Sequence, residues 1–218
     1  MLEKTKRTWP TKDVMNQIYD KHLWGGKAFD FYSGDGSHRT EIVEPYLEAV
    51  IPFLNSHNKS LIVCDLGCGD FNIGKHLTQF SKKYFAVDIV EKLIERNKTI
   101  FKEENLEFQC LDIVKDELPT GDCIILRQVL QHISNIEIQE IVKKLSAYKY
   151  VILTEHLPSD NFIPNQDIIS GQGIRLKQNS GVDILKAPFN LNVKSSVVIN
   201  EITLGNKQGQ IVTILYTR

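Results

Sequence analysis

VCDLGCGDF, at residues 63–71, decides the fold of this chain. An apolar run that ends in an acid and leads into a Gly-x-Gly turn is typical of a parallel strand whose carboxyl end meets a ligand. Neither Gly67 nor Gly69 has a Cβ, so each can take a positive φ and let the backbone approach a ligand closely. Asp65 stands at the carboxyl end of the strand. We expect it to face the crevice in which open α/β sheets bind ligands.

Outward from this stretch, short apolar runs alternate with stretches of helical periodicity, which is the order of a parallel sheet with crossover helices. Further strands are expected at 84–89, 106–111, 123–128 and 150–155, after a first strand at 61–66. Helices are expected over 72–81, after the second strand, and from Ser134 to about Ala147. Ser134 and Glu137 have the spacing of a capping box.

Two β-branched stretches, 192–202 and 210–217, predict a terminal antiparallel hairpin, and helices are expected upstream over 11–23 and 41–54. The fold class is therefore α/β: a Rossmann-like, mostly parallel sheet with a C-terminal hairpin, helices on both faces and an N-terminal helical cap. We expect one domain, with a cap or lid over 1–58, a core over 59–156, an insert over 157–190 and the hairpin over 191–218.

Composition narrows the class of protein. The 218 residues are 42% hydrophobic and 24% charged with a net charge of -1, and Lys and Arg occur in pairs at most, so the sequence gives no strong nucleic-acid signal. The N-terminal stretch lacks the apolar core of a signal peptide and no segment is long and apolar enough to cross a bilayer, so a cytoplasmic protein without membrane contact is expected. The four cysteines form no CxxC pair, which favours reduced thiols and no metal site.

A nicotinamide oxidoreductase is disfavoured by the glycine pattern. The dinucleotide fingerprint G-x-G-x-x-G needs a third glycine where Asn72 stands, and Gly74 comes two residues late.

The segment DLGCGDFNIGKHL, at 65–77, resembles motif I of the class I S-adenosylmethionine (SAM)-dependent methyltransferases, and residues 60–156 fit that family in order. The resemblance implies SAM as the cofactor, S-adenosylhomocysteine (SAH) as its product, and cofactor contacts along the whole turn: Asp65, Leu66, Gly67, Cys68 and Gly69.

Two acids at later strand ends have matching positions in the family. Asp88, followed by Ile89, stands where the family's acid accepts hydrogen bonds from both ribose hydroxyls. Asp112 stands where the family's acid contacts the adenine amino group, and Ile113 where the next residue packs on the ring. From the residues alone, Asp88 is equally suited to be a helix N-cap and Asp112 to begin a turn.

The methionine end of SAM is expected near residues 126–134, which resemble the family's segment after the fourth strand. Arg127 and Gln128 are expected to shape the SAM pocket. The Gly-rich and aromatic stretch before motif I has the composition of a lid. Similar enzymes cover SAM with this region and often bind its carboxylate with an upstream arginine, for which Arg39 is our candidate. Phe29 and Phe31 are alternatively core residues of the cap.

Methyl transfer from SAM is an in-line displacement in which positioning does most of the catalysis, and an oxygen or nitrogen acceptor also benefits from a base. His132, Glu155 and His156 are the candidate bases, although His132 also fits a structural packing role.

Candidate acceptor contacts come from both sides of the expected crevice: Trp24, Tyr32 and Arg175, with Gln172 and Lys177 nearby. Trp24 and Tyr32 are alternatively core residues of the cap. Cationic and amide groups suit a hydroxylated or anionic small molecule.

These residues predict a SAM-dependent methyltransferase that acts on an oxygen or nitrogen of a small polar acceptor, a sugar or another metabolite. The lack of an Asn-Pro-Pro-Tyr or Asp-Pro-Pro-Tyr tetrapeptide after the fourth strand disfavours amino-methylation of adenine or glutamine, and the lack of Pro-Cys disfavours a covalent cytosine mechanism. A non-catalytic SAM-binding scaffold subunit and a protein or RNA methyltransferase stay open as alternatives. The sequence does not indicate an oligomeric state.

Overall fold

The computed structural model describes residues 9–26, 30–205 and 208–218. Seven strands form one sheet in the order β3-β2-β1-β4-β5-β7-β6. Strands β1 to β5 run parallel, and β7 is antiparallel to both β5 and β6. The strands are β1 (Ile62–Leu66), β2 (Lys83–Asp88), β3 (Leu106–Cys110), β4 (Cys123–Arg127), β5 (Tyr150–Leu157), β6 (Ser195–Thr203) and β7 (Gln210–Thr217). The predicted fold class is confirmed. Phe29 and residues 1–8 of the cap lie outside the described residues.

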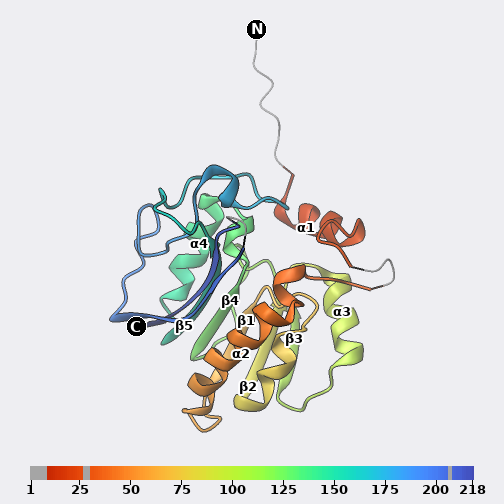
Figure 1. The fold of residues 1–218 in the computed structure, drawn as a ribbon. Coiled ribbons are helices and arrows are strands. Elements are labelled where there is room, and N and C mark those ends of the chain that lie inside the picture. Colours follow the sequence, from red (N-terminus) through yellow and green to blue (C-terminus); the bar gives the residue numbers. More distant parts are fainter. Residues whose placement is uncertain (1–8, 27–29, 206–207) are drawn as a thin grey trace.

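The central strands β1, β4 and β5 are apolar at most positions because both faces of the sheet are covered, and their charged residues stand toward the carboxyl ends. On one face, Tyr46, Val50 and Leu54 of helix α2 (Thr40–Asn55) pack against Val63 of β1. On the other face, α4 (Asn135–Leu145) and the insert pack against Cys64 and its neighbours. Figure 1 shows α2 in front of the strands and α4 behind them. Successive residues of one strand therefore serve two separate apolar layers.

The remaining helices are α1 (Thr11–Asp20) and α3 (Glu91–Ile100). Helix α4 begins with the predicted capping box, in which the Ser134 hydroxyl accepts from the Glu137 N–H and the Glu137 carboxylate accepts from the Ser134 N–H at 3.2 Å. In Figure 1, α1 and the loops of the insert lie along the upper end of the sheet, close to the ends of β1 and β4. These segments close the end at which a ligand would bind.

The prediction of a helix over 72–81 is wrong. The chain there forms two short 3₁₀ turns, η2 (Gly74–His76) and η3 (Thr78–Phe80). Gly74 is a poor helix former. Glycine is also required at position 74, because a Cβ there would lie 2.2 Å from Cε2 of Phe71. Residues 111–122, all of them described, contain no helix either, so β3 and β4 are joined by a loop.

Candidate functional site

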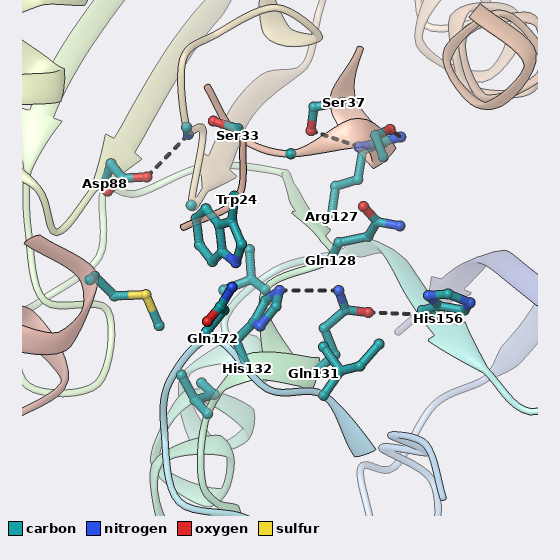
Figure 2. Close-up of a pocket in the computed structure, with 18 of the residues that line it drawn as sticks. Trp24, Ser33, Ser37, Asp88, Arg127, Gln128, Gln131, His132, His156 and Gln172 are labelled. Carbon is teal, nitrogen blue, oxygen red and sulfur yellow. Dashed lines mark hydrogen bonds between the residues drawn. The ribbon is translucent and has the colours of Figure 1, made fainter. Parts of the chain in front are cut away.

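A cavity of about 470 Å³ lies at the carboxyl ends of β1, β2, β4 and β5. Its other walls come from α1, from the lid segment 30–39, from the insert and from the β6–β7 hairpin. The strand order reverses between β1 and β4, which is the switch point where open α/β sheets bind ligands. Figure 2 shows the side chains that converge on this cavity.

The motif I turn lines the cavity through Gly67, Cys68 and Gly69, as the sequence predicts. Both glycines have a positive φ, +82° and +56°. A Cβ on Gly67 would lie 2.5 Å from Val129, and one on Gly69 would lie 2.3 Å from the Ser33 hydroxyl. The two glycines thus allow the turn to approach the β4 loop and the lid, in addition to any ligand.

Asp65 and Leu66 do not line the cavity, which corrects the prediction that they contact the cofactor. Oδ2 of Asp65 accepts a hydrogen bond from the Tyr84 hydroxyl at 3.0 Å, within the buried sheet. Burial raises the pKa of Asp65 to about 7. Leu66 is fully buried. The side chains of Asp65 and Leu66 lie in the two packed layers on opposite faces of β1.

Asp88 lines the cavity at the end of β2 and is only 7% exposed. Its carboxylate accepts from the Gly69 N–H at 3.1 Å and from the Val90 N–H at 3.0 Å, one on each oxygen. Burial raises the pKa of Asp88, and these N–H groups oppose the shift. The N-cap of α3 is Val90, so the alternative role of Asp88 as an N-cap is wrong. Each oxygen keeps a lone pair for a ligand.

Asp112, Ile113 and Ile89 also line the cavity. Oδ1 of Asp112 accepts from the Val114 N–H at 3.0 Å, and Oδ2 accepts from the Lys115 ammonium at 2.8 Å. Asp112 therefore begins a turn, as one interpretation of the sequence has it, and faces the cavity as well.

The lid is fastened to the motif I turn by polar contacts. The Ser33 N–H donates to Asp70 at 2.9 Å, and the Asp70 N–H donates back to the Ser33 hydroxyl at 2.8 Å. Nε2 of His38 lies 2.6 Å from the same Asp70 carboxylate. On the other side, Arg127 donates to the carbonyl of Gly36 and to the Ser37 hydroxyl. The lid is thus closed against two strand ends.

The two arginines of the site differ in their partners. Arg39 lines the cavity, but its side chain is 47% exposed and donates from Nε to Glu41 at 2.8 Å. Arg127 is mostly buried, with its guanidinium 4.8 Å from the ring centre of Tyr46, and no carboxylate of the described residues pairs with it. Burial lowers the pKa of Arg127. An anion in the cavity would offset the cost of burying this charge.

Of the aromatic residues predicted to touch the acceptor, only Trp24 lines the cavity. Its indole packs 5.3 Å from the Tyr19 ring and 5.1 Å from the His132 ring, centre to centre. Tyr32 lies outside the cavity, which corrects the prediction for it. Its ring stacks on His38 at 4.2 Å, and its hydroxyl donates to Asp35 at 2.8 Å.

His132 lines the cavity with its ring uncharged at neutral pH, because burial lowers its pKa to about 4. The Gln131 amide oxygen accepts from the backbone N–H of His156 at 3.0 Å, so the amide nitrogen faces Nε2 of His132, at 3.2 Å. Figure 2 shows this chain of contacts. Nε2 of His132 is an acceptor already in use, so in this arrangement its lone pair is not free to take a proton.

Glu155 does not face the main cavity. It is 2% exposed and lines a second cavity of about 190 Å³ between β5, β7 and the insert. Oε1 accepts from the Leu130 N–H at 3.1 Å, and Oε2 has no partner among the described residues. Burial raises the pKa of Glu155 to about 8. The predicted role of this carboxyl as a base beside the acceptor does not agree with its placement.

Arg175 also lies away from the cavity, and its prediction as an acceptor contact is corrected. It is 1% exposed, and its guanidinium donates to three carbonyls and an amide oxygen: Gln166 O at 2.9 Å, Leu130 O at 3.0 Å, Ile133 O at 2.8 Å and Asn135 Oδ1 at 2.8 Å. The residue fastens the insert to the turn after β4.

Lys177 is exposed and does not line the cavity, whereas Gln172 does.

Two lining residues, Leu204 and Gln208, have no signal in the sequence, whereas Gln131 falls within the predicted segment 126–134. Gln208 stands in the turn of the β6–β7 hairpin, where its carbonyl accepts from Nε2 of His156 at 2.6 Å. A hairpin predicts only that two strands pair. It does not predict which cavity its turn reaches.

No group of three or more potential metal-ligating side chains occurs among the described residues. In the same part of the chain, no helix has the length and apolar character needed to cross a membrane.

The sheet order, the antiparallel hairpin and a cavity with acids at the ends of β2 and β3 define the class I methyltransferase fold. The family model described as "Methyltransferase domain" matches residues 63–148. The matched segment runs from β1 to α4, so this part of the chain is similar to methyltransferase domains, and the fold is that of the class I methyltransferases.

One relative in sequence is a ubiquinone biosynthesis O-methyltransferase of Rickettsia akari (strain Hartford), 26% identical over 140 residues. The match covers 61% of this chain and 55% of that protein, so the chain spans about half the length of its relative.

Two solved structures share the fold. The N-methyltransferase NodS of Bradyrhizobium japonicum WM9, in complex with SAH, has a TM-score of 0.67 at 10% identity and covers 94% of this chain and 99% of its own. Magnesium protoporphyrin IX methyltransferase of Synechocystis PCC 6803, with bound SAM, has a TM-score of 0.62 at 16% identity and covers 98% and 100%.

Arg175→Lys should lower the free energy of unfolding by about 2–4 kcal/mol, because an ammonium cannot reach all four acceptors and leaves buried carbonyls unpaired. Urea denaturation measures the change. Lys177→Arg, an exposed change in the same turn, is the control. A loss below about 0.5 kcal/mol for Arg175→Lys, the size of an ordinary surface substitution, would contradict the fastening role.

Glu155→Gln should remove part of the pH dependence of stability. The pKa of Glu155 is raised in the folded protein, so the folded state holds its proton more tightly than the unfolded state. Its contribution is fully present below about pH 4.5 and is lost as the pH rises to about 8, at no more than about 1.4 kcal/mol per pH unit. Urea unfolding at pH 5 to 8 should therefore show the variant gaining on the wild type as the pH rises. Glu140→Gln, on the surface of α4, controls for the charge change, and parallel curves for Glu155→Gln would contradict the expectation.

Proposed function

We propose that this protein binds SAM in the cavity and transfers its methyl group to an oxygen or nitrogen of a small polar acceptor, a sugar or another metabolite. The observation that carries the proposal is the carboxylate of Asp88, buried at the end of β2, facing the cavity and holding a lone pair free on each oxygen. Two neighbouring hydroxyls, such as those of a ribose, are the donors that such a carboxylate binds best.

The rest of the cofactor follows from the arrangement around Asp88. Asp112 and Ile113 supply a polar and an apolar contact for the adenine, as in the family. The backbone of Gly67, Cys68 and Gly69 approaches the middle of the molecule.

The guanidinium of Arg127, at the end of β4, has no carboxylate partner among the described residues, and we assign to it the carboxylate of the methionine moiety, with Gln128 beside it. Arg39, which is already paired with Glu41, is a second contact at the rim.

The acceptor would then lie over β4 and β5, between Trp24 and His156. The sulfonium of SAM makes the methyl group an electrophile, so the protein must hold the acceptor in line with the carbon–sulfur bond and exclude water. The relatives include both an O-methyltransferase and an N-methyltransferase, so their names do not choose between the two atoms.

Calorimetry with SAM, SAH and NAD tests the cofactor. We expect binding of SAM and SAH, and a 10- to 100-fold weaker SAM affinity in Asp88→Ala, because a charged acceptor for two hydroxyls is lost. Asp160→Asn, an exposed change in the insert, is the control, and thermal unfolding checks that the variant is folded. Tight binding of NAD without SAM would overturn the cofactor assignment. An unchanged SAM affinity in folded Asp88→Ala would show that the ribose lies elsewhere.

Release of SAH distinguishes an enzyme from a SAM-binding scaffold subunit. We expect SAM to be converted to SAH when a mixture of small polar metabolites is supplied, and Asp88→Ala to slow the conversion at limiting SAM. Chromatography of SAH measures it. Undiminished SAM binding with no turnover across metabolites, peptides and RNA would favour the scaffold.

A further inference from the structure

His156 is held in one tautomer by the hairpin turn. Its Nε2 lies 2.6 Å from the carbonyl oxygen of Gln208. A carbonyl only accepts, so Nε2 carries the proton and the neutral ring keeps its lone pair on Nδ1. None of the described residues hydrogen-bonds to Nδ1, and the side chain lines the cavity. Burial lowers the pKa of His156, while the bond to the Gln208 carbonyl raises it.

The turn that supplies this carbonyl is shaped for a close approach. Gly209 has a φ of +86°, and a Cβ there would lie 2.4 Å from the carbonyl oxygen of Leu157 and 3.2 Å from Nε2 of His156. Only glycine permits both the backbone conformation and the contact. The amide oxygen of Gln131 accepts from the backbone N–H of His156 at 3.0 Å and so holds the main chain at this position. Among the described residues, the bond that orients the ring itself runs from Nε2 to the Gln208 carbonyl.

The described part of the wall around His156 is uncharged. The β4 loop, the insert and the hairpin contribute four amide side chains to the cavity, Gln128, Gln131, Gln172 and Gln208, and their other lining side chains, apart from His132, are aliphatic. The charged groups that line the described part of the cavity belong instead to the lid and to the ends of β2 to β4: Asp35, Arg39, Asp88, Asp112 and Arg127. His132, which shares the wall, has a pKa of about 4 and is neutral.

This wall favours one kind of acceptor. Amide side chains both donate and accept, which matches hydroxyl groups. Among the described residues of this wall, an ammonium would find no carboxylate and a carboxylate would find no cation, so either would lose solvation without compensation. A carboxylate would also need no base, whereas His156 presents one.

We infer that the acceptor is an uncharged molecule methylated on a hydroxyl oxygen, with Nδ1 of His156 as the base that takes the hydroxyl proton. This inference rests on the proposed function. The hydroxyl oxygen forms a bond to the methyl carbon as the carbon–sulfur bond of SAM breaks. The electron pair of that bond stays on sulfur, which gives neutral SAH, and the proton passes to Nδ1. The Gln208 carbonyl then stabilises the imidazolium through Nε2–H.

Nitrogen-15 NMR of the SAH-loaded protein tests the tautomer, with the His156 signals assigned by their loss in His156→Gln. At pH 7 we expect a neutral ring with Nε2 protonated and Nδ1 bare. A ring that carries its proton on Nδ1, or that is charged at this pH, would overturn the role of Nδ1 as the base.

Two matched sets of compounds test the acceptor: benzyl alcohol, benzylamine and benzoate, and methyl glucoside, glucosamine and glucuronate. We expect SAH release with a hydroxyl compound and at least 10-fold less with its charged counterpart. Glucosamine and glucuronate carry hydroxyls, as methyl glucoside does, so the comparison within this set tests the effect of the charge alone. Release that is greater with an amine or an acid, or no saturable binding of any neutral hydroxyl compound to the SAH-loaded protein, would overturn the inference. Unchanged calorimetric binding of SAM would show that the proposed function still stands.

His156→Gln should lower kcat about 100-fold or more with little change in SAM affinity, since Gln keeps the polar volume but is no base. His76→Gln, an exposed change on η2, is the control. A Gly209→Ala variant with an altered His156 nitrogen spectrum and a lower kcat would support the positioning by the turn. Full activity in His156→Gln with the best hydroxyl compound would overturn the assignment.

Discussion

The cavity depends on the close approach of the motif I turn to the lid at Gly69 and Ser33. A single Cβ on Gly69 would collide with the Ser33 hydroxyl. The reciprocal bonds between Ser33 and Asp70, with His38 on the same carboxylate, hold the lid over the strand ends. A closed lid removes water from the cavity, and every charge inside then interacts more strongly with a ligand. The glycine of this turn is thus a condition for closure as much as for cofactor approach.

The charged and the neutral groups that line the described part of the closed cavity come from different segments of the chain. The charged lining groups come from the lid and from the ends of β2 to β4, while β5, the insert and the hairpin contribute neutral ones. SAM, the cofactor we propose for this cavity, carries a sulfonium, an ammonium and a carboxylate, so the charged half would match the charged reactant. In the described part of the neutral half, no charged side chain acts on a histidine. A histidine there therefore stays uncharged and able to accept a proton. The two halves are complementary parts of one electrostatic arrangement.

The sheet could be predicted from sequence because each buried strand is an apolar run bounded by turn residues, and the acids Asp88 and Asp112 follow from strand ends. The direction of Asp65 could not, since successive strand residues face opposite layers and Tyr84 supplies its partner from another strand. The prediction of a helix over 72–81 rests on apolar periodicity, which takes no account of Gly74, a poor helix former at the start of the first 3₁₀ turn. Arg175 and Gln208 reach their places through tertiary contacts of loops, for which local patterns carry no signal.

The insert and the hairpin turn, whose places could not be predicted from the sequence, form much of the neutral half of the cavity. In the proposed function they determine which acceptor this half recognises. The Arg175 guanidinium joins the insert to the turn after β4 and so fixes the wall that carries Gln172. The hairpin turn reaches the same wall through Gln208 and Gly209. Neither segment contributes to the motif I turn or to the acids of β2 and β3. Substitutions in the insert or the hairpin should therefore affect the acceptor more than the cofactor, because among the described residues these segments bond to the turn after β4 and not to the motif I turn or to the acids of β2 and β3.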